Sequence, residues 1–410
     1  MNRLIYNNAV KNLFLIALII IFLNLNPASA RFQKNAKSER ELKFSSETEN
    51  FLKDIFKEFK NEIFIDYHLH LLGLDSKNGC YVNPDMKSAA HPVQYLKYKF
   101  YLKAGGIKNE KKSDDEYIEK LVVIARHTQK YVKTKYLLFA FDKFYYPDGK
   151  CDLKKTQFYV PNEYMFSIVK KYPDLFTPVV SINPYRKDAL DELKKWAETG
   201  VKYIKWLPNA MGINPADARI GEFYLKMKEY EMILISHSGE EDAINCKGYQ
   251  KLGNPLLLRG PLDAGVKVIA AHCASSGKNV DFESPDNKME LNFNLLMRML
   301  KEKKYENLLF ADISALTQFN RMDKYLDTIL NDDDIQKKLV NGSDYPLPAI
   351  NFIIQTKKLR RNKFITENER IILNEIYKQN QLLFDLVLKM ILKSHNTGNK
   401  FNKNIFIKKF

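Results

Sequence analysis

Short apolar runs alternate with longer amphipathic segments from about residue 47 to residue 392. An apolar run of about four to eight residues fits a buried strand, whereas apolar positions three or four residues apart fit one face of a helix. Strands that alternate with helices form βα units around a parallel sheet. The pattern predicts eight strands, at residues 63–70, 136–142, 177–182, 202–207, 232–237, 267–272, 308–312 and 339–344.

Eight βα repeats in one chain favour an α/β fold of the (β/α)8 TIM-barrel type. A doubly wound open sheet typically has fewer strands and a Gly-rich phosphate turn, and no GxGxxG follows the first strand here. The connection 71–113 is too long for an ordinary βα turn, so we expect an insertion that forms a lid over the barrel mouth. Helices are predicted at 114–131, 162–171, 187–198, 221–230, 291–303 and 367–392.

The first 30 residues have the features of an export signal. Two basic residues precede and flank an apolar run at 13–23, and Ala-Ser-Ala at 28–30 matches a cleavage site. The apolar run is shorter than the roughly 20 residues that span a bilayer, so an uncleaved membrane anchor is the alternative and not the main expectation. The predicted organisation is a signal peptide at 1–30, a flexible linker at 31–46, the barrel at 47–393 and a basic tail at 394–410.

The chain carries a net charge of +16, which raises the question of an anionic partner. Its lysines are mixed with Asp and Glu in helix-like stretches, and dense basic runs occur only at 357–363 and 393–409. We therefore expect solvated faces and no nucleic-acid partner, with a surface-binding tail as the alternative. The 45% of hydrophobic residues suffices for a large core. No stable membrane span is expected after cleavage, and the oligomeric state is left open.

Four cysteines occur, and in an oxidising compartment an even number permits disulfides. A bridge between Cys80 and Cys151, both in predicted loops, is one option. Cys273 follows an apolar strand and is expected to be a small buried hydrophobe.

Polar residues end five successive predicted strands, at a spacing close to one βα repeat. They are Lys205, His237, His272, Asp312 and Asp344, separated by 32, 35, 40 and 32 residues. In a barrel the carboxyl ends of all strands meet at one mouth, where active sites lie. These five side chains are therefore expected to project toward the same place.

The first strand adds an HxH pair. Asp66, His68 and His70 are each two residues apart, so strand alternation predicts that all three face inward. Two neutral imidazoles on one face can bind one cation. Asp66 is expected to orient a histidine ligand through the N–H of its ring.

These motifs resemble the amidohydrolase superfamily, specifically its amidohydrolase-related (amidohydrolase 2) branch, over about residues 60–385. The resemblance rests on Ile-Asp-Tyr-His-Leu-His at 65–70, Ile-Lys-Trp-Leu-Pro at 204–208, Ser-His-Ser-Gly at 236–239, Ala-Ala-His-Cys at 270–273 and Gly-Ser-Asp-Tyr-Pro at 342–346. It implies a metal-dependent TIM-barrel enzyme with one or two divalent ions. Zinc is the default, and manganese, iron and nickel are alternatives.

The resemblance also implies roles for individual residues. His68, His70 and Asp344 would hold one metal. His237 and His272 would hold a second one, which Lys205, carboxylated by CO₂, would bridge to the first. In mononuclear relatives His237 joins the first metal, and His272 contacts the water or the substrate.

The function implied is that of an exported, periplasmic or secreted, hydrolase. A metal-activated water would attack an amide, lactone or ester-like bond of a small-molecule substrate, with Asp344 as proton shuttle. One alternative is a metal-dependent decarboxylase or hydratase on the same scaffold. Another is an exported barrel protein without catalytic activity.

Overall fold

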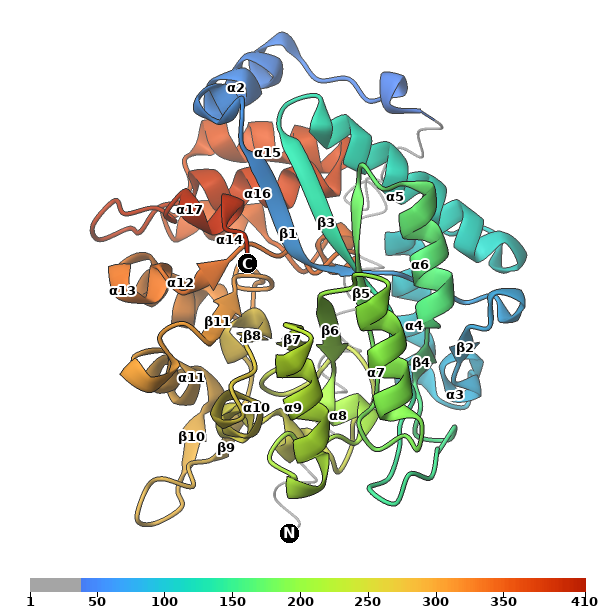
Figure 1. The fold of residues 1–410 in the computed structure, drawn as a ribbon. Helices are drawn as coiled ribbons and strands as arrows, with labels where there is room; N and C mark the ends of the chain where they lie inside the picture. Colours follow the sequence, from blue (N-terminus) through green and yellow to red (C-terminus); the bar gives the residue numbers. More distant parts are fainter. Residues whose placement is uncertain (1–37) are drawn as a thin grey trace.

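The computed structural model describes residues 38–410 and contains a barrel of eight parallel strands with helices outside it (Figure 1). The predicted fold class is confirmed. In spatial order the strands are β1 (Ile63–His70), β3 (Lys133–Phe139), β5 (Phe176–Val180), β6 (Tyr203–Trp206), β7 (Ile233–Ser236), β8 (Val268–Ala270), β11 (Leu309–Asp312) and β12 (Leu339–Val340).

The barrel closes between β1 and the segment that follows β12. The Tyr67 amide donates to the Asn341 carbonyl at 2.9 Å, and the His70 amide donates to the Tyr345 carbonyl at 3.0 Å. The Asp344 amide returns a bond to the His68 carbonyl at 2.7 Å. Asp344 is thereby fixed beside the HxH pair of β1.

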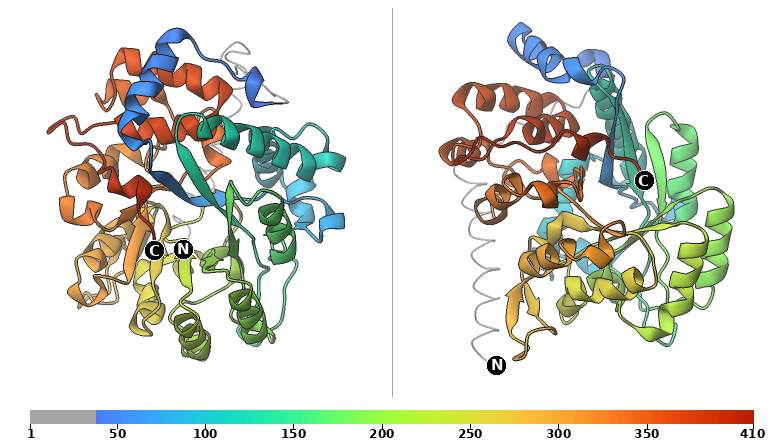
Figure 2. Two further views of the ribbon diagram at one scale, coloured as in Figure 1. Left: turned by 45° about the horizontal axis from the view of Figure 1, so that its top comes forward. Right: turned by 60° about the vertical axis from the view of Figure 1, so that its left-hand side comes forward.

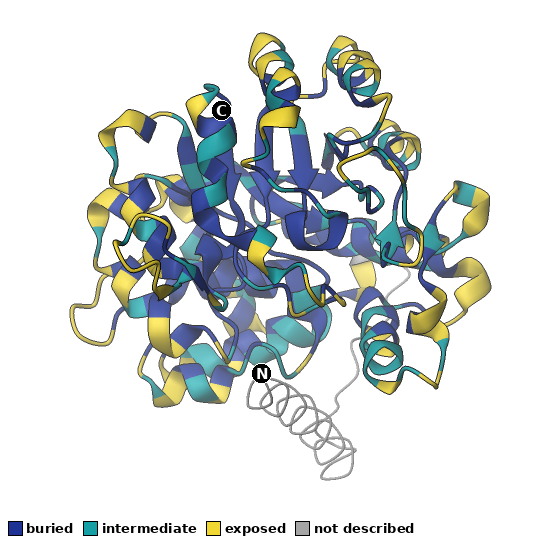
Figure 3. Cartoon of the chain, turned by 90° about the horizontal axis from the view of Figure 1, so that it is seen from below, coloured by how far each residue is buried: buried dark blue, intermediate teal, exposed yellow. Residues whose placement is uncertain are grey.

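Helices surround the barrel and place exposed residues on the outside of the molecule, with the strands buried inside (Figure 3). The outer helices include α5 (Ser113–Gln129), α6 (Asn162–Lys171), α7 (Ala189–Glu198), α9 (Gly221–Glu229), α10 (Arg259–Asp263), α11 (Asn292–Leu300), α12 (Met322–Leu330), α14 (Thr356–Arg361), α15 (Glu367–Gln379) and α16 (Gln381–Ile391). The prediction of a single helix at 367–392 is wrong, because the structure has two helices there. Asn380 separates them, because its extended backbone ends α15 and its side chain caps α16 by accepting from the Leu383 amide.

Inward-facing side chains of the strands form a separate core inside the barrel. It contains Tyr67, Leu137, Phe139, Val179, Ile233, Ile235, Ile269 and Val340, with Tyr203 and Phe310 packed against it. Because side chains alternate along a strand, the residue two positions after an inward apolar residue also faces inward. Lys205 follows Tyr203, His237 follows Ile235, and Asp312 follows Phe310 in this way.

A register shift in β1 changes the expected alternation. The pairing with β3 slips between Asp66 and Leu69, as in a β-bulge, so Tyr67 faces the barrel core while Asp66 faces α16. Asp66 lines a small cavity there with Asp385 and Leu386. The prediction that Asp66 shares the inward face of His68 and His70 is therefore wrong.

The long connection after β1 is structured. It contains a short strand β2 (Tyr81–Val82), which pairs with β4 (Phe158–Tyr159), and the helices α3 (Pro84–Lys87) and α4 (Pro92–Gly105). Side chains of α4 reach the segment after β7, where Lys97 and Tyr101 donate to the carbonyls of Asp242 and Ala243. Its role as a lid stays a prediction.

The C-terminal segment, predicted as a basic tail, packs onto the barrel, and in Figure 1 its end lies within the ring of strands. Ile405 and Phe406 in α17 (Asn404–Ile407) are buried. The Phe410 ring lies 5.6 Å from Tyr67 and 4.6 Å from Phe310, between ring centroids, and so covers the barrel core from its amino end. Figure 2 shows this segment from two other sides.

At the other end of the described chain, Leu42 is buried and Ser45 caps α2 (Ser46–Phe56), so residues of the predicted linker pack against the barrel. The signal peptide lies outside the described residues. Within residues 38–410 no helix combines the length and the apolar character needed to cross a bilayer. All four cysteines are free, so the optional Cys80–Cys151 bridge does not form, and Cys273 is fully buried as expected.

Candidate metal centre

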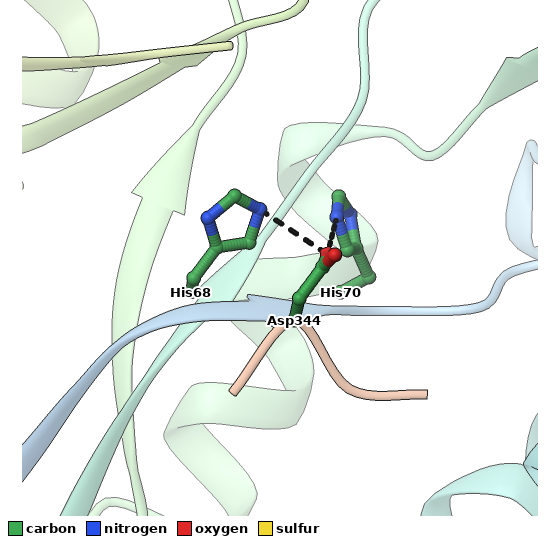
Figure 4. Close-up of side chains that lie close together, drawn as sticks. All are labelled: His68, His70 and Asp344. Carbon is green, nitrogen blue, oxygen red and sulfur yellow. Dashed lines mark ion pairs between the residues drawn. The ribbon is translucent and has the colours of Figure 1, made fainter. Parts of the chain in front are cut away.

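Three side chains converge at the carboxyl end of the barrel, where β1 meets the segment after β12 (Figure 4). Asp344 Oδ1 lies 3.4 Å from His68 Nε2 and 3.2 Å from His70 Nε2. Ligand atoms about 2.0–2.1 Å from a tetrahedral zinc ion are about 3.3–3.4 Å apart, so these separations match the edges of a metal site. His68 and Asp344 are buried, whereas the side chain of His70 is 27% exposed and opens the site toward solvent.

Asp312 fixes the ring of His68. Its Oδ2 lies 2.9 Å from His68 Nδ1, and an ionised carboxylate only accepts hydrogen bonds. Nδ1 is therefore the N–H of the ring, and the lone pair of Nε2 points toward Asp344. Burial is the main cause that lowers the pKa of His68, which keeps the imidazole neutral and able to bind a cation.

The other oxygen of Asp312 holds the neighbouring elements. Asp312 Oδ1 accepts from the His272 amide at 2.9 Å and from the Ser314 amide at 3.0 Å. The hydroxyl of Ser314 in turn lies 2.7 Å from His272 Nδ1. One carboxylate thus ties β11, the turn after β8 and the first histidine of β1 together.

A left-handed turn places His272 in the site. Three successive residues, His272, Cys273 and Ala274, have positive φ values of 58°, 49° and 48°. Such a conformation costs about 1–2 kcal/mol per non-glycine residue, and residues held in it concentrate at functional sites. The turn brings the His272 ring to 4.6 Å from that of His68 and 5.2 Å from that of His237, between centroids.

His237 contains a buried nitrogen without a protein partner. Its Nδ1 lies 3.6 Å from Glu241 Oε2, while Nε2 makes no hydrogen bond with any described residue. A buried polar atom normally has a partner, so His237 Nε2 is available to bind a cation or another ligand. Glu241 is buried as well, which raises the pKa of its carboxyl group to about 7.

Lys205 is buried and faces the same centre. Its Nζ lies 3.3 Å from His68 Nε2 and 4.9 Å from the centre of the Phe139 ring. Burial lowers the pKa of Lys205 to about 8, against the opposite effect of Asp312 and Asp344. The uncharged amine is the form that reacts with CO₂, and a lowered pKa makes this form more abundant near neutral pH. The position of Lys205 is therefore compatible with the carbamate that the resemblance implies.

The structure brings together His68, His70, Lys205, His237, His272 and Asp344, but gives Asp66 another task. Asp66 Oδ1 accepts from the amides of His68 at 3.0 Å and Ser343 at 2.8 Å, so it fixes the backbone of β1 and the segment after β12. The expected contact with a histidine ring is made by Asp312 instead, because the bulge turns Asp66 away. The contact of Ser314 with His272 was not predicted from the sequence, although Ser314 lies only two residues after Asp312.

Comparisons with known proteins found similarity in solved structures alone. No protein-family model and no curated protein sequence matches the chain. An uncharacterized TIM-barrel protein from Bordetella bronchiseptica is 13% identical and has a TM-score of 0.47, over 76% of this chain and 99% of that one.

Two further similar structures are enzymes. One is 5-carboxyvanillate decarboxylase from Novosphingobium aromaticivorans with bound manganese (10% identity, TM-score 0.41, 79% of this chain and 97% of that one). The other is adenine deaminase from Arthrobacter aurescens (13% identity, TM-score 0.34, 80% and 98%).

Proposed function

We propose that this protein is a metal-dependent hydrolase of the amidohydrolase type. The observation that carries the proposal is the convergence of His68 Nε2, His70 Nε2 and Asp344 Oδ1, with the first ring oriented by Asp312. An imidazole whose second nitrogen is held by a carboxylate is the usual arrangement of a histidine ligand. These three residues would hold one divalent ion, for which zinc is the first choice.

A second ion, if bound, would take the remaining donors. His237 Nε2 is buried without a partner among residues 38–410, and the His272 ring lies 4.6 Å from that of His68 and 5.2 Å from that of His237, between centroids. Lys205, whose Nζ lies 3.3 Å from His68 Nε2, would supply anionic oxygen ligands as a carbamate, formed when its neutral amine adds CO₂ and releases a proton. The chemistry that a divalent cation supplies when bound is Lewis acidity, which polarises a carbonyl oxygen and lowers the pKa of water.

Asp344 would move the proton of the reaction. Its carboxylate is buried beside both histidines of β1, and its Oδ2 lies 3.9 Å from His272 Nδ1. It would accept a proton from the attacking water and return it to the leaving group. His272, held by the Ser314 hydroxyl, would orient the water or the substrate. The bond cleaved would be an amide, lactone or ester of a small molecule.

We further propose that the protein is exported, on the basis of the charged start, the apolar run 13–23 and the Ala-Ser-Ala sequence at 28–30. N-terminal sequencing of the exported protein should begin at Arg31. Recovery of an intact chain that starts at Met1 and needs detergent for extraction would favour an anchor.

The experiment that tests the activity combines elemental analysis with a substrate screen. The purified parent should contain about one or two equivalents of metal and hydrolyse a lactone or cyclic amide; release of CO₂ from carboxylated aromatics would favour the decarboxylase alternative. His68→Ala should lose metal and activity together. His91→Ala is the matched control, because His91 is 44% exposed and pairs with Asp85 in the insertion. A parent without stoichiometric metal would contradict the proposal.

A further inference from the structure

Arg321 is a buried arginine that forms no direct ion pair with a carboxylate of residues 38–410. It lies at the end of the segment after β11, directly before α12, and only 9% of its surface is exposed. Its Nη1 donates to Ser275 Oγ at 3.0 Å, while its Nε is buried and makes no hydrogen bond. Within residues 38–410 no carboxylate lies within 4.0 Å of this guanidinium.

Other largely buried arginines of this protein are neutralised. Arg186 contacts Asp142 and Asp188, and Arg259 contacts two glutamates, although both guanidinium groups are more exposed than that of Arg321. A buried charge without a counter-ion is costly, so an anion from outside the chain is expected to complete the site.

The guanidinium of Arg321 lies beside the candidate metal centre. Ser275, which accepts its hydrogen bond, ends the left-handed turn that begins at His272. The positive charge of Arg321 is among the causes that lower the pKa values of His237 and His272. An anion held by Arg321 would thus lie next to the turn that carries His272.

We propose that Arg321 binds a carboxylate group of the substrate, so the enzyme acts on small carboxylic acids; this rests on the proposed function. Guanidinium matches carboxylate in two parallel hydrogen bonds, and Nε is one of the donors that remain free. A single positive charge suits a monoanion. The negative charges of Glu241, Asp242 and Asp344, which act on Arg321, would repel a phosphate dianion about twice as strongly as a monocarboxylate.

Carboxylate binding can be measured without knowledge of the substrate. Calorimetric titrations would compare benzoate and butyrate, which are monoanions, with benzamide and butyramide, on the parent as purified and after removal of metal by a chelator. The parent should bind at least one acid at least about tenfold more tightly than its amide, in both states. Arg321→Gln should weaken binding of that acid by about 30-fold or more, as expected for loss of one partner of a buried charge pair. Binding of the amide should not change.

Two further variants complete the test. Arg321→Lys keeps the positive charge but lacks the paired N–H donors of the guanidinium, so it should retain part of the preference for the acid over its amide. This variant also serves as the test if Arg321→Gln does not fold. Arg219→Gln is the matched control, because Arg219 is 62% exposed and pairs with Asp217.

The proposal is overturned if no acid is preferred over its amide in the parent. It is also overturned if Arg321→Gln binds the acid within threefold of the parent or, where that variant does not fold, if Arg321→Lys does so. Inorganic phosphate that binds more tightly than the acids and depends on Arg321 would also overturn it. Elemental analysis separates this failure from that of the proposed function. Absence of metal refutes the hydrolase, whereas Arg321-dependent binding in the chelated protein supports the carboxylate site by itself.

Discussion

Replacement of Asp312 by asparagine tests how the barrel prepares its first histidine for a metal. The carboxylate accepts from His68 Nδ1 through Oδ2 and from the His272 and Ser314 amides through Oδ1. An asparagine that keeps its oxygen toward the two amides must place its NH₂ group against His68 Nδ1. Nδ1 then has to accept, so the proton moves to Nε2, where the lone pair for a metal is needed.

The size of the effect follows from this change of tautomer. Loss of the partner that orients a histidine ligand typically weakens metal binding 10- to 100-fold, which corresponds to about 1.4–2.7 kcal/mol. The fold should persist, because the two backbone amides keep an acceptor. Metal affinity would be measured by competition with a chromophoric chelator, and the ring proton by ¹⁵N NMR of labelled histidine.

The matched control is Asp142→Asn. Asp142 is also a buried carboxylate near the carboxyl end of a strand, but it contacts Arg186 and the Asn183 amide and no histidine. Its replacement should leave metal affinity within about threefold of the parent. If Asp312→Asn also binds metal within threefold of the parent, with Nε2 of His68 unprotonated, the argument from tautomers is wrong.

Three further predictions follow from the site and the fold. Asp344→Asn should keep the metal bound by His68 and lose about 10² to 10⁴ in kcat, measured on a substrate found by screening; turnover within a few-fold of the parent would exclude a proton shuttle. Lys205→Ala should reduce bound metal from about two equivalents to one or none, with partial rescue by short carboxylic acids, whereas unchanged content would favour a single ion. Phe406→Ala should lower the free energy of unfolding by about 3–5 kcal/mol in a denaturant titration, because the ring is 2% exposed; Leu225→Ala, at a 61% exposed position, should change it by less than about 0.5 kcal/mol.

The strand positions and the residues that end them were predictable because the repeat is regular. Each inward apolar residue and the polar residue two positions later follow from alternation, as Tyr203 and Lys205 show. β1 matches its predicted range, and the other strands lie within the predicted runs or begin a few residues before them. The mouth of the barrel could therefore be assembled from spacing alone.

Features that depend on tertiary contacts could not be predicted. At the bulge in β1, Asp66 accepts from the His68 amide of its own strand and from the Ser343 amide in the segment after β12, which is 277 positions away in the sequence. The break at Asn380 depends on a side-chain cap within an otherwise helical pattern. Arg321 precedes a helix and has the sequence features of an ordinary solvated residue; only its burial and the absence of a described counter-ion single it out.

The C-terminal segment has a consequence for how the molecule reaches its native state. The Tyr67 hydroxyl of β1 donates to the Lys408 carbonyl, across a separation of 341 residues. The first strand of the barrel therefore lacks its final contacts until nearly all of the described chain has been made. Contacts this distant in sequence slow folding, and a barrel without its C-terminal segment exposes apolar strand residues to solvent. During synthesis the protein should therefore be recognised by chaperones and proteases until residues 404–408 have docked. The time at which α17 docks sets the end of this susceptibility to proteolysis.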